Sequence, residues 1–533
     1  MKLITVLFLF SVLSILSYAQ PTYLRWDKSI GGTGTEMPAV LKQLPNGGFI
    51  MLAASTSDSS FDKSENNRDT SHLTYDYWLV RLDSNGNKIW DKTYGGKGND
   101  APTALLVLPD KGYLLCGNSV SPAGFDKTDS VRGNYDFWIV RTDSNGVKIW
   151  DKTIGGTGLD QVQGAAFTTD GYIMLAGITL SGIGGDKTTA LIALGQFDFW
   201  VVKINLAGTI ILDRTLGGSL SDNCYAITAT DNGGALLAGI SNSPIGFSKT
   251  QAAIGSYDYW VVRIDSLCRR LWDKTYGGLQ NDYCFNVVST LDHGFLLGGN
   301  SSSTAGFDKT DSARGQSDYW IIKLNANGVK QWDKTFGGTD FEELYSLQLT
   351  NDHGFLLGGD SYSPISFDKT ENNLGAEQMW MVKTDSVGNK VWDKTFFTAG
   401  HDEFGLMLET KDGCYVGTIF TAADTGGYKS SFNYGGGDCW LAKLCYGALA
   451  VPDIRETNHF ECYPNPVKNS ITIRQFSPGT IINIYNISGE KIFQQQINFN
   501  ETTQIDVSKF PVGLYIISLQ DNKSVYSTKF LKE

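Results

Sequence analysis

Acidic side chains recur at equivalent places along the chain, each at the end of a glycine-rich loop that reads Gly-Gly-x-Gly-x-acid or a variant of it. The seven carboxylates are Glu36, Asp100, Asp160, Asp222, Asp282, Glu342 and Asp402. A ring of carboxylates could attract a cation or a polyhydroxylated ligand, or carry out glycoside hydrolysis. Alternatively, each acid caps its own loop by accepting hydrogen bonds from backbone N–H groups. Capping is favoured because a residue that repeats in every unit usually has the same structural role in each.

Other chemistry-bearing patterns are weak. The sequence shows no serine nucleophile elbow, no phosphate-cradling loop and no zinc-binding helix. Residues 155–162 match a β-roll calcium repeat, but they lack stacked copies. No two histidines have the spacing of metal ligands; they are His72, His293, His353, His401 and His459. We therefore predict no catalytic residue, no metal and no cofactor.

Two tryptophan-bearing patterns recur about every sixty residues, which indicates a modular array. Trp-Asp-Lys occurs at Trp26, Trp90, Trp150, Trp272, Trp332 and Trp392, and a degenerate Leu-Asp-Arg copy begins at Leu212. Asp-aromatic-Trp or a variant ends at Trp78, Trp138, Trp200, Trp260, Trp320, Trp380 and Trp440. Together the two patterns account for all 13 tryptophans. Tryptophan therefore belongs to the repeat and is expected in its core.

One repeat predicts four antiparallel strands. In the second unit, these cover residues 104–108, 113–116, 136–141 and 148–153. The Asn-Gly pair at Asn145 predicts a type I′ turn between the last two strands. Strands that are apolar on both faces must be covered on both sides, which favours blades of a propeller over an open stack.

The two ends of the array complement each other. Residues 23–30 match the fourth strand of a unit, but no first, second or third strand precedes them. The last unit has its first three strands and lacks the fourth. We predict that the N-terminal strand completes the seventh blade, so that residues 20–446 form a closed seven-bladed β-propeller. Between Leu24 and Cys445 the pattern resembles the bacterial propeller repeats known as SBBP repeats. That resemblance implies a fold and hardly a function.

A second repeat lies in the long loop between the second and third strands. Phe-Asp-Lys-Thr stands at Phe125 and is echoed at Phe61, Gly185, Phe247, Phe307 and Phe367. Loops of this kind often bind partners, and propeller topology places them on the same face as the acid-ended loops. The phenylalanine could instead pin each loop to its blade, and we favour that interpretation.

Residues 1–19 are typical of a secretory signal peptide, with Lys2, an apolar core and a small-residue cleavage site. No apolar run is long enough to span a bilayer. The formal net charge of −12 argues against binding to nucleic acid or to an anionic membrane. In the exported protein, antiparallel strands would bring Cys414 and Cys445 together, and the two could form a disulfide.

The last part of the chain follows a different pattern. After a linker over residues 447–459, at least five short strands within residues 460–533 predict a small Ig-like β-sandwich, which completes an all-β chain. Tyr-Pro-Asn-Pro begins at Tyr463, Asn-Ile-Ser-Gly-Glu-Lys at Asn486 and Pro-Val-Gly-Leu-Tyr at Pro511. Their order closely resembles the type A C-terminal sorting domain of the type IX secretion system. The resemblance implies export across both bacterial membranes, with the secretion machinery recognising the tail. It also implies that the tail is commonly removed and that the cargo is anchored to surface lipopolysaccharide or released. The alternative is an ordinary Ig-like binding module.

These observations predict a secreted or cell-surface propeller that acts as a non-catalytic binding or scaffold module for an extracellular glycan or protein. The alternative is a secreted carbohydrate-active hydrolase that uses the seven carboxylates. Because an enzyme is expected to break the repeat where it works, the regularity of the array favours binding. The seventh blade is the main departure, which we attribute to ring closure.

Overall fold

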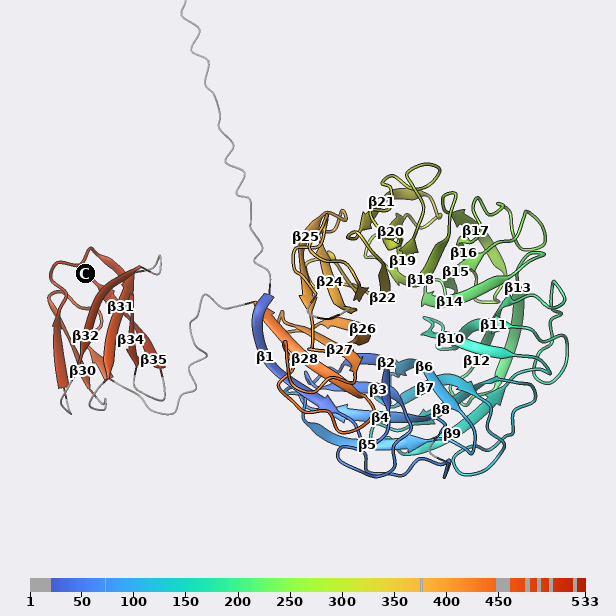
Figure 1. Ribbon diagram of the computed structural model, residues 1–533, viewed down its shortest axis with the longest axis horizontal. Coiled ribbons are helices and arrows are strands. Elements are labelled where there is room, and N and C mark those ends of the chain that lie inside the picture. The colour runs from blue at the N-terminus through green and yellow to red at the C-terminus, as the bar shows by residue number, and fades with distance from the viewer. Residues whose placement is uncertain are drawn as a thin grey trace, which may run out of the picture. The chain divides into compact units, whose positions relative to one another are not determined.

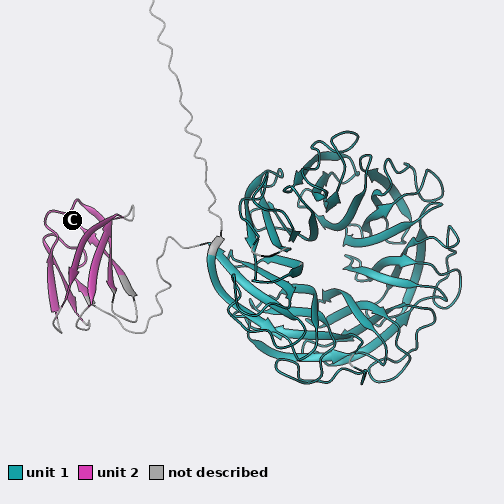
Figure 2. Cartoon of the chain, viewed as in Figure 1, with its two compact units in different colours: residues 1–446 teal, residues 447–533 magenta. Residues whose placement is uncertain are grey.

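A computed structural model describes residues 21–71, 73–373, 375, 377–446, 461–474, 480–486, 490–497, 502–520 and 525–533. The chain divides into two compact units, Met1–Tyr446 and Gly447–Glu533 (Figure 2). The predicted signal peptide and linker lie outside the described residues. In the described ranges all regular elements are β-strands, and no helix there is long and apolar enough to cross a membrane.

The first unit consists of seven four-stranded antiparallel sheets arranged in a ring (Figure 1). In chain order, the first three sheets are β2 (Glu36–Gln43), β3 (Phe49–Ser55), β4 (Asp76–Leu82) and β5 (Lys88–Tyr94); β6 (Asp100–Val107), β7 (Tyr113–Ser119), β8 (Asp136–Thr142) and β9 (Lys148–Ile154); β10 (Asp160–Phe167), β11 (Ile173–Thr179), β12 (Asp198–Ile204) and β13 (Ile210–Leu216). The next three are β14 (Asp222–Ala229), β15 (Ala235–Ser241), β16 (Asp258–Ile264) and β17 (Arg270–Tyr276); β18 (Asp282–Ser289), β19 (Phe295–Ser301), β20 (Asp318–Leu324) and β21 (Lys330–Phe336); β22 (Glu342–Leu349), β23 (Phe355–Ser361), β24 (Gln378–Thr384) and β25 (Lys390–Phe396). The seventh contains β26 (Asp402–Glu409), β27 (Tyr415–Thr421) and β28 (Asp438–Tyr446), with β1 (Pro21–Ile30) as its fourth strand. This architecture is the predicted seven-bladed propeller.

The middle strands of each blade make the core. β3 and β4, for example, are buried at every residue, because neighbouring blades cover both faces of the sheet. The tryptophans of the Asp-aromatic-Trp pattern are all fully buried. Tyr77 packs 4.8 Å from Trp138 of the next blade and donates its hydroxyl hydrogen to the Trp138 carbonyl at 3.1 Å. The repeated aromatic pair therefore joins successive blades.

The chain ends of the ring meet in the seventh blade. β1 pairs with β28 in antiparallel register, with Trp26 opposite Lys443. Asp27 accepts hydrogen bonds from the Trp440 indole N–H at 3.0 Å and from the Ser430 backbone N–H at 2.8 Å. In the other blades the equivalent contacts lie within a continuous segment, whereas here they join residues about 400 positions apart.

The disulfide between Cys414 and Cys445 lies in the same blade, with the two Cα atoms 4.3 Å apart. Tyr415, at the start of β27, is opposite Leu444 near the end of β28. The antiparallel register therefore sets both cysteines side by side at one end of the blade.

The hairpin turn between the last two strands is not the type I′ turn that the Asn-Gly pair predicted. Only Gly146 takes a positive φ, of 76°, and Asn145 does not. The Asp143 carboxylate instead accepts hydrogen bonds from the backbone N–H groups of Asn145 and Val147, both at 2.8 Å. An aspartate-capped turn followed by a glycine bulge needs only one residue with positive φ.

The second unit has one three-stranded and one four-stranded sheet. The first contains β29 (Glu461–Tyr463), β30 (Ser470–Arg474) and β33 (Thr502–Asp506); the second contains β31 (Ile481–Asn486), β32 (Lys491–Gln496), β34 (Gly513–Gln520) and β35 (Val525–Lys532). Buried residues of both sheets, among them Ile473, Ile484 and Phe530, share one core. The two sheets thus form the small sandwich expected from the sequence.

Candidate functional site

The seven loop carboxylates are all fully buried, with 0% of each residue exposed. Asp160 shows how they are held: its Oδ2 accepts hydrogen bonds from the Gly156 backbone N–H and from the Ser181 hydroxyl, both at 2.7 Å. Glu36 accepts equivalent bonds from Gly32 at 2.8 Å and from Ser57 at 2.5 Å. This geometry supports the capping interpretation, because a ligand in the ring could touch these acids only if the loops opened.

Six of these acids have a second buried carboxylate beside them, from the blade that precedes them in the ring. The second carboxylates are the aspartates of the Asp-aromatic-Trp pattern: Asp76, Asp136, Asp198, Asp258, Asp318 and Asp438. A Cβ added to Gly217 would lie 2.0 Å from Asp198 Oδ1 and 3.1 Å from Asp222 Oδ2. Glycine is therefore required where the two carboxylates approach the loop.

Burial raises the pKa of all six second carboxylates. At five of them, all except Asp318, the negative charge of the neighbouring acid raises the pKa further. The pKa of Asp198 rises from 3.8 to about 7, with Asp222 as its charged neighbour. The sixth blade has an amide instead: Gln378 donates from its Nε2 to the Thr398 carbonyl at 2.8 Å, beside Asp402. In this blade, therefore, the loop acid has a neutral amide beside it instead of a second carboxylate.

The Phe-Asp-Lys-Thr loop is pinned by its lysine and not by its phenylalanine. Lys63 is 2% exposed, donates to the Thr93 hydroxyl at 2.5 Å and lies 6.0 Å from the centre of the Trp78 ring. Burial lowers the pKa of Lys63 to about 8. Phe61 is 65% exposed, so the prediction that phenylalanine plugs the blade is wrong. The same exposure holds at Phe125, Phe247, Phe307 and Phe367.

The first strands of all seven blades converge at the centre of the ring (Figure 1). Residues of these strands line a cavity of about 630 Å³, the channel of the propeller. One half of its lining is small or uncharged and consists of Pro38, Ala39, Pro102, Thr103 and Gln163. The other half is aromatic and acidic, from Tyr225, Tyr283, Phe285, Glu343 and Tyr345. The channel is thus asymmetric although the fold around it is regular.

The aromatic half forms a connected surface. The Tyr225 and Phe285 rings lie 5.2 Å apart, and the Tyr283 and Phe285 rings lie 6.1 Å apart and nearly parallel, at 14°. The Tyr345 hydroxyl donates to the Glu343 carboxylate, and burial raises the pKa of Tyr345. These side chains are about half-buried, so their faces remain accessible to a ligand.

Sequence reasoning missed this surface, although the sequence contains a signal for it. Three positions after the loop acid, the fourth to sixth blades carry Tyr225, Phe285 and Tyr345. The other blades carry Ala39, Thr103, Gln163 and Gly405 at that position. A break in the repeat at channel-facing positions is therefore visible in the sequence, although the repeated acids are the more prominent pattern.

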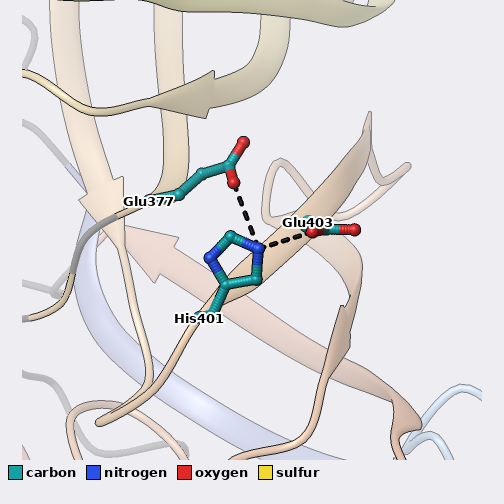
Figure 3. Close-up of side chains that lie close together, drawn as sticks. All are labelled: Glu377, His401 and Glu403. Carbon is teal, nitrogen blue, oxygen red and sulfur yellow. Dashed lines mark hydrogen bonds and ion pairs between the residues drawn. The ribbon is translucent and has the colours of Figure 1, made fainter.

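A second departure from the repeat lies at the boundary between the sixth and seventh blades (Figure 3). His401 Nε2 lies 3.3 Å from Glu377 Oε2 and 2.5 Å from Glu403 Oε1. Glu377 is 5% exposed, and burial raises its pKa. In the described part of the chain, these side chains form the one group of three or more His, Cys, Asp or Glu residues close enough to share a metal ion.

Residues 461–533 match the family model of the secretion system C-terminal sorting domain. No curated protein matches the chain at a significant level. The Pan2 WD40 domain of Neurospora crassa is similar at 8% identity, covering 80% of this chain and 98% of its own, with a TM-score of 0.42. A protein of unknown function from Dyadobacter fermentans is similar at 9% identity, covering 80% and 99%, with a TM-score of 0.40.

PorZ, a surface component of the type IX secretion system of Porphyromonas gingivalis, is similar at 10% identity, covering 95% of this chain and 85% of its own, with a TM-score of 0.23. These values are too low to carry a function from any of the three proteins to this chain. The fold follows from the seven sheets themselves, and the family match concerns the tail. The chain is thus a seven-bladed β-propeller that carries a type IX secretion system C-terminal sorting domain.

Proposed function

We propose that the protein is a secreted or cell-surface binding module that holds an extracellular glycan in the channel of its propeller, without catalysis. The aromatic and acidic half of the channel is the observation that carries the proposal. The apolar faces of sugar rings pack against aromatic rings such as Tyr283 and Phe285. The Glu343 carboxylate and the Asn300 amide in the same lining provide hydrogen bonds to hydroxyl groups.

The distribution of carboxylates favours binding over hydrolysis. A glycoside hydrolase commonly uses two carboxylates about 5–10 Å apart on either side of the scissile bond. The lining of the channel contains one carboxylate, Glu343, and that group already accepts a hydrogen bond from Tyr345. The seven loop acids are fully buried and capped.

Export is the second part of the proposal. The sorting domain supports delivery to the cell surface or the medium by the type IX machinery, which would read residues 460–533. Residues 1–19 would direct the first membrane crossing as a signal peptide. Removal of the tail and anchoring to lipopolysaccharide belong to the same proposal.

The binding role is tested with the mature chain, residues 20–533, on a panel of bacterial and host glycans. We expect retention of a defined class of glycan without release of product. Tyr283→Ala should abolish retention, because the ring faces the channel, and Phe307→Ala should not, because that ring is 68% exposed on a loop. Loss of binding in Phe307→Ala alone would move the site to the loops, and product release would favour the hydrolase.

A further inference from the structure

We propose that Glu377, His401 and Glu403 bind one divalent transition-metal ion, of the Zn²⁺ or Mn²⁺ class, at the boundary between the sixth and seventh blades (Figure 3). The three side chains come from two blades. Glu377 directly precedes β24, His401 directly precedes β26, and Glu403 is the second residue of β26. This proposal does not depend on glycan binding, although the nearby Glu343 carboxylate of the channel raises the pKa of Glu377.

The distances fit a metal centre after a small adjustment. One donor atom from each side chain lies within 4.8 Å of the other two. Tetrahedral zinc, bound at about 2.0–2.1 Å, places its ligand atoms about 3.3 Å apart. The separation between His401 Nε2 and Glu377 Oε2 is already 3.3 Å, and that between Nε2 and Glu403 Oε1, at 2.5 Å, needs to widen by less than 1 Å.

The charges also call for a cation. The same imidazole nitrogen faces two carboxylates, and it can donate a hydrogen bond to only one of them. Glu377 is almost completely buried, so its negative charge is poorly solvated. A divalent ion between the three groups would compensate both carboxylates at once.

Hydrogen bonds from residues outside the cluster orient Glu377. The Tyr362 hydroxyl donates a hydrogen bond to Glu377 Oε2 at 2.6 Å, and the Asp402 backbone N–H donates to the Glu377 carbonyl at 3.3 Å. Hydrogen bonds to a ligating carboxylate of this kind fix its position in metal sites. The carboxylate is therefore held in place before an ion arrives.

The repeat provides an internal comparison. The backbone hydrogen bond between Glu377 and Asp402 recurs at the other blade boundaries, where the residue equivalent to Glu377 is Tyr75, Tyr135, Phe197, Tyr257, Ser317 or Gly437. The residue equivalent to His401 is Thr35, Asn99, Leu159, Ser221, Asn281 or Phe341. None of these positions carries a histidine or a carboxylate. The fold therefore does not require the cluster, which speaks for a role beyond structure.

The choice of metal follows from the donors. One imidazole and two carboxylates suit zinc or manganese, whereas calcium prefers six to eight oxygen ligands. The His401 and Glu403 side chains are 48% and 34% exposed, so one side of the cluster is open. Three protein ligands with an open side leave room for water or for a ligand oxygen, as in exchangeable rather than closed zinc sites.

The test is isothermal titration of Zn²⁺ into the chelator-treated mature chain, residues 20–533. We expect one equivalent to bind, His401→Ala to abolish binding, and Glu403→Gln to weaken it by more than about tenfold. His293→Ala is the matched control, because His293 forms an exposed pair with Asp231 at 2.5 Å without a third donor, and this variant should bind zinc like the wild type.

Both cluster variants change partly exposed side chains, so their melting temperatures without metal should match the wild type. If one variant fails to fold, the other decides the result. Absence of an equimolar zinc site in the wild type would overturn the proposal, and so would an equimolar site that is unchanged in the cluster variants. A titration with Ca²⁺ should show no equimolar binding; calcium binding in preference to zinc would contradict the assignment of the metal.

Discussion

The buried carboxylate pairs predict that the folded propeller becomes less stable as the pH rises from 5 to 7. Asp198 illustrates the cause. Its Oδ2 accepts a hydrogen bond from the Ile192 backbone N–H at 2.7 Å, and Oδ1 has no hydrogen-bond partner among the described residues. Asp222 lies beside it and is already capped by Gly218 at 2.6 Å. Holding a proton on Asp198 avoids two adjacent buried negative charges.

The sign and size follow from linkage between proton binding and folding. The pKa of Asp198 is about 7 in the folded chain and 3.8 in its ordinary state. Between these values the folded chain binds more protons than the unfolded chain, so stability is greatest at low pH and is lost as the pH rises through 7. At about 1.4 kcal/mol per pH unit, falling off near pH 7 where Asp198 is half-protonated, this one group contributes a loss of about 2 kcal/mol between pH 5 and 7.

Asp198→Asn tests the argument, because an amide is neutral at every pH and an amide, Gln378, already occupies the equivalent position of the sixth blade. Urea unfolding at pH 5 and pH 7.5 should show a fall in stability that is smaller by about 2.5 kcal/mol in the variant than in the wild type. The exposed Asp311→Asn serves as the matched control and should keep the wild-type difference. An equal fall in Asp198→Asn and wild type would refute the claim that folded Asp198 keeps its proton up to about pH 7.

Three further predictions concern the ring and its export. Deleting residues 21–29 removes most of β1, the partner of β28, and should expose the β28 amides to rapid hydrogen exchange; unchanged protection would contradict closure by the N-terminal strand. Cys414→Ser opens a disulfide that spans 31 residues and should lower the free energy of unfolding by about 3–4 kcal/mol, measured with and without reductant; a loss below about 1 kcal/mol would show that the strand pairing alone holds the blade end. Removing residues 460–533 should leave the propeller folded but retained inside the cell envelope, as seen by fractionation; normal appearance at the surface would exclude the tail as the export signal.

The fold could be predicted from the sequence because the same pattern of strands and turns recurs in successive units. The two tryptophan patterns mark the third and fourth strands of each blade, and the complete burial of residues such as Trp138, which is 0% exposed, explains why that spacing is kept. The turn at Asp143 was predicted wrongly, because local hydrogen bonds from backbone N–H groups to the Asp143 carboxylate outweighed the preference of Asn-Gly. Loop pinning was also assigned to the wrong residue, because lysine seldom serves as a buried anchor and the compensating Thr93 and Trp78 are remote in sequence.

The candidate sites were harder to predict than the fold. The loop acids stood out because they repeat, and the same repetition reflects a structural role in which they are buried. Tyr225, Phe285 and Tyr345 converge only when the ring brings three first strands together. Glu377 is 24 residues before His401 in the chain, and the two meet only across a blade boundary, so ligand spacing along the sequence could not reveal the cluster.

The central claim is that the aromatic half of the channel binds a glycan, and equilibrium binding to a retained glycan tests it most directly. Tyr283→Ala and Glu343→Gln should each weaken binding at least tenfold, while the melting temperature stays near that of the wild type. Thr103→Ala, on the opposite wall of the same cavity, should change the affinity by less than about threefold. Wild-type affinity in both Tyr283→Ala and Glu343→Gln would contradict the claim.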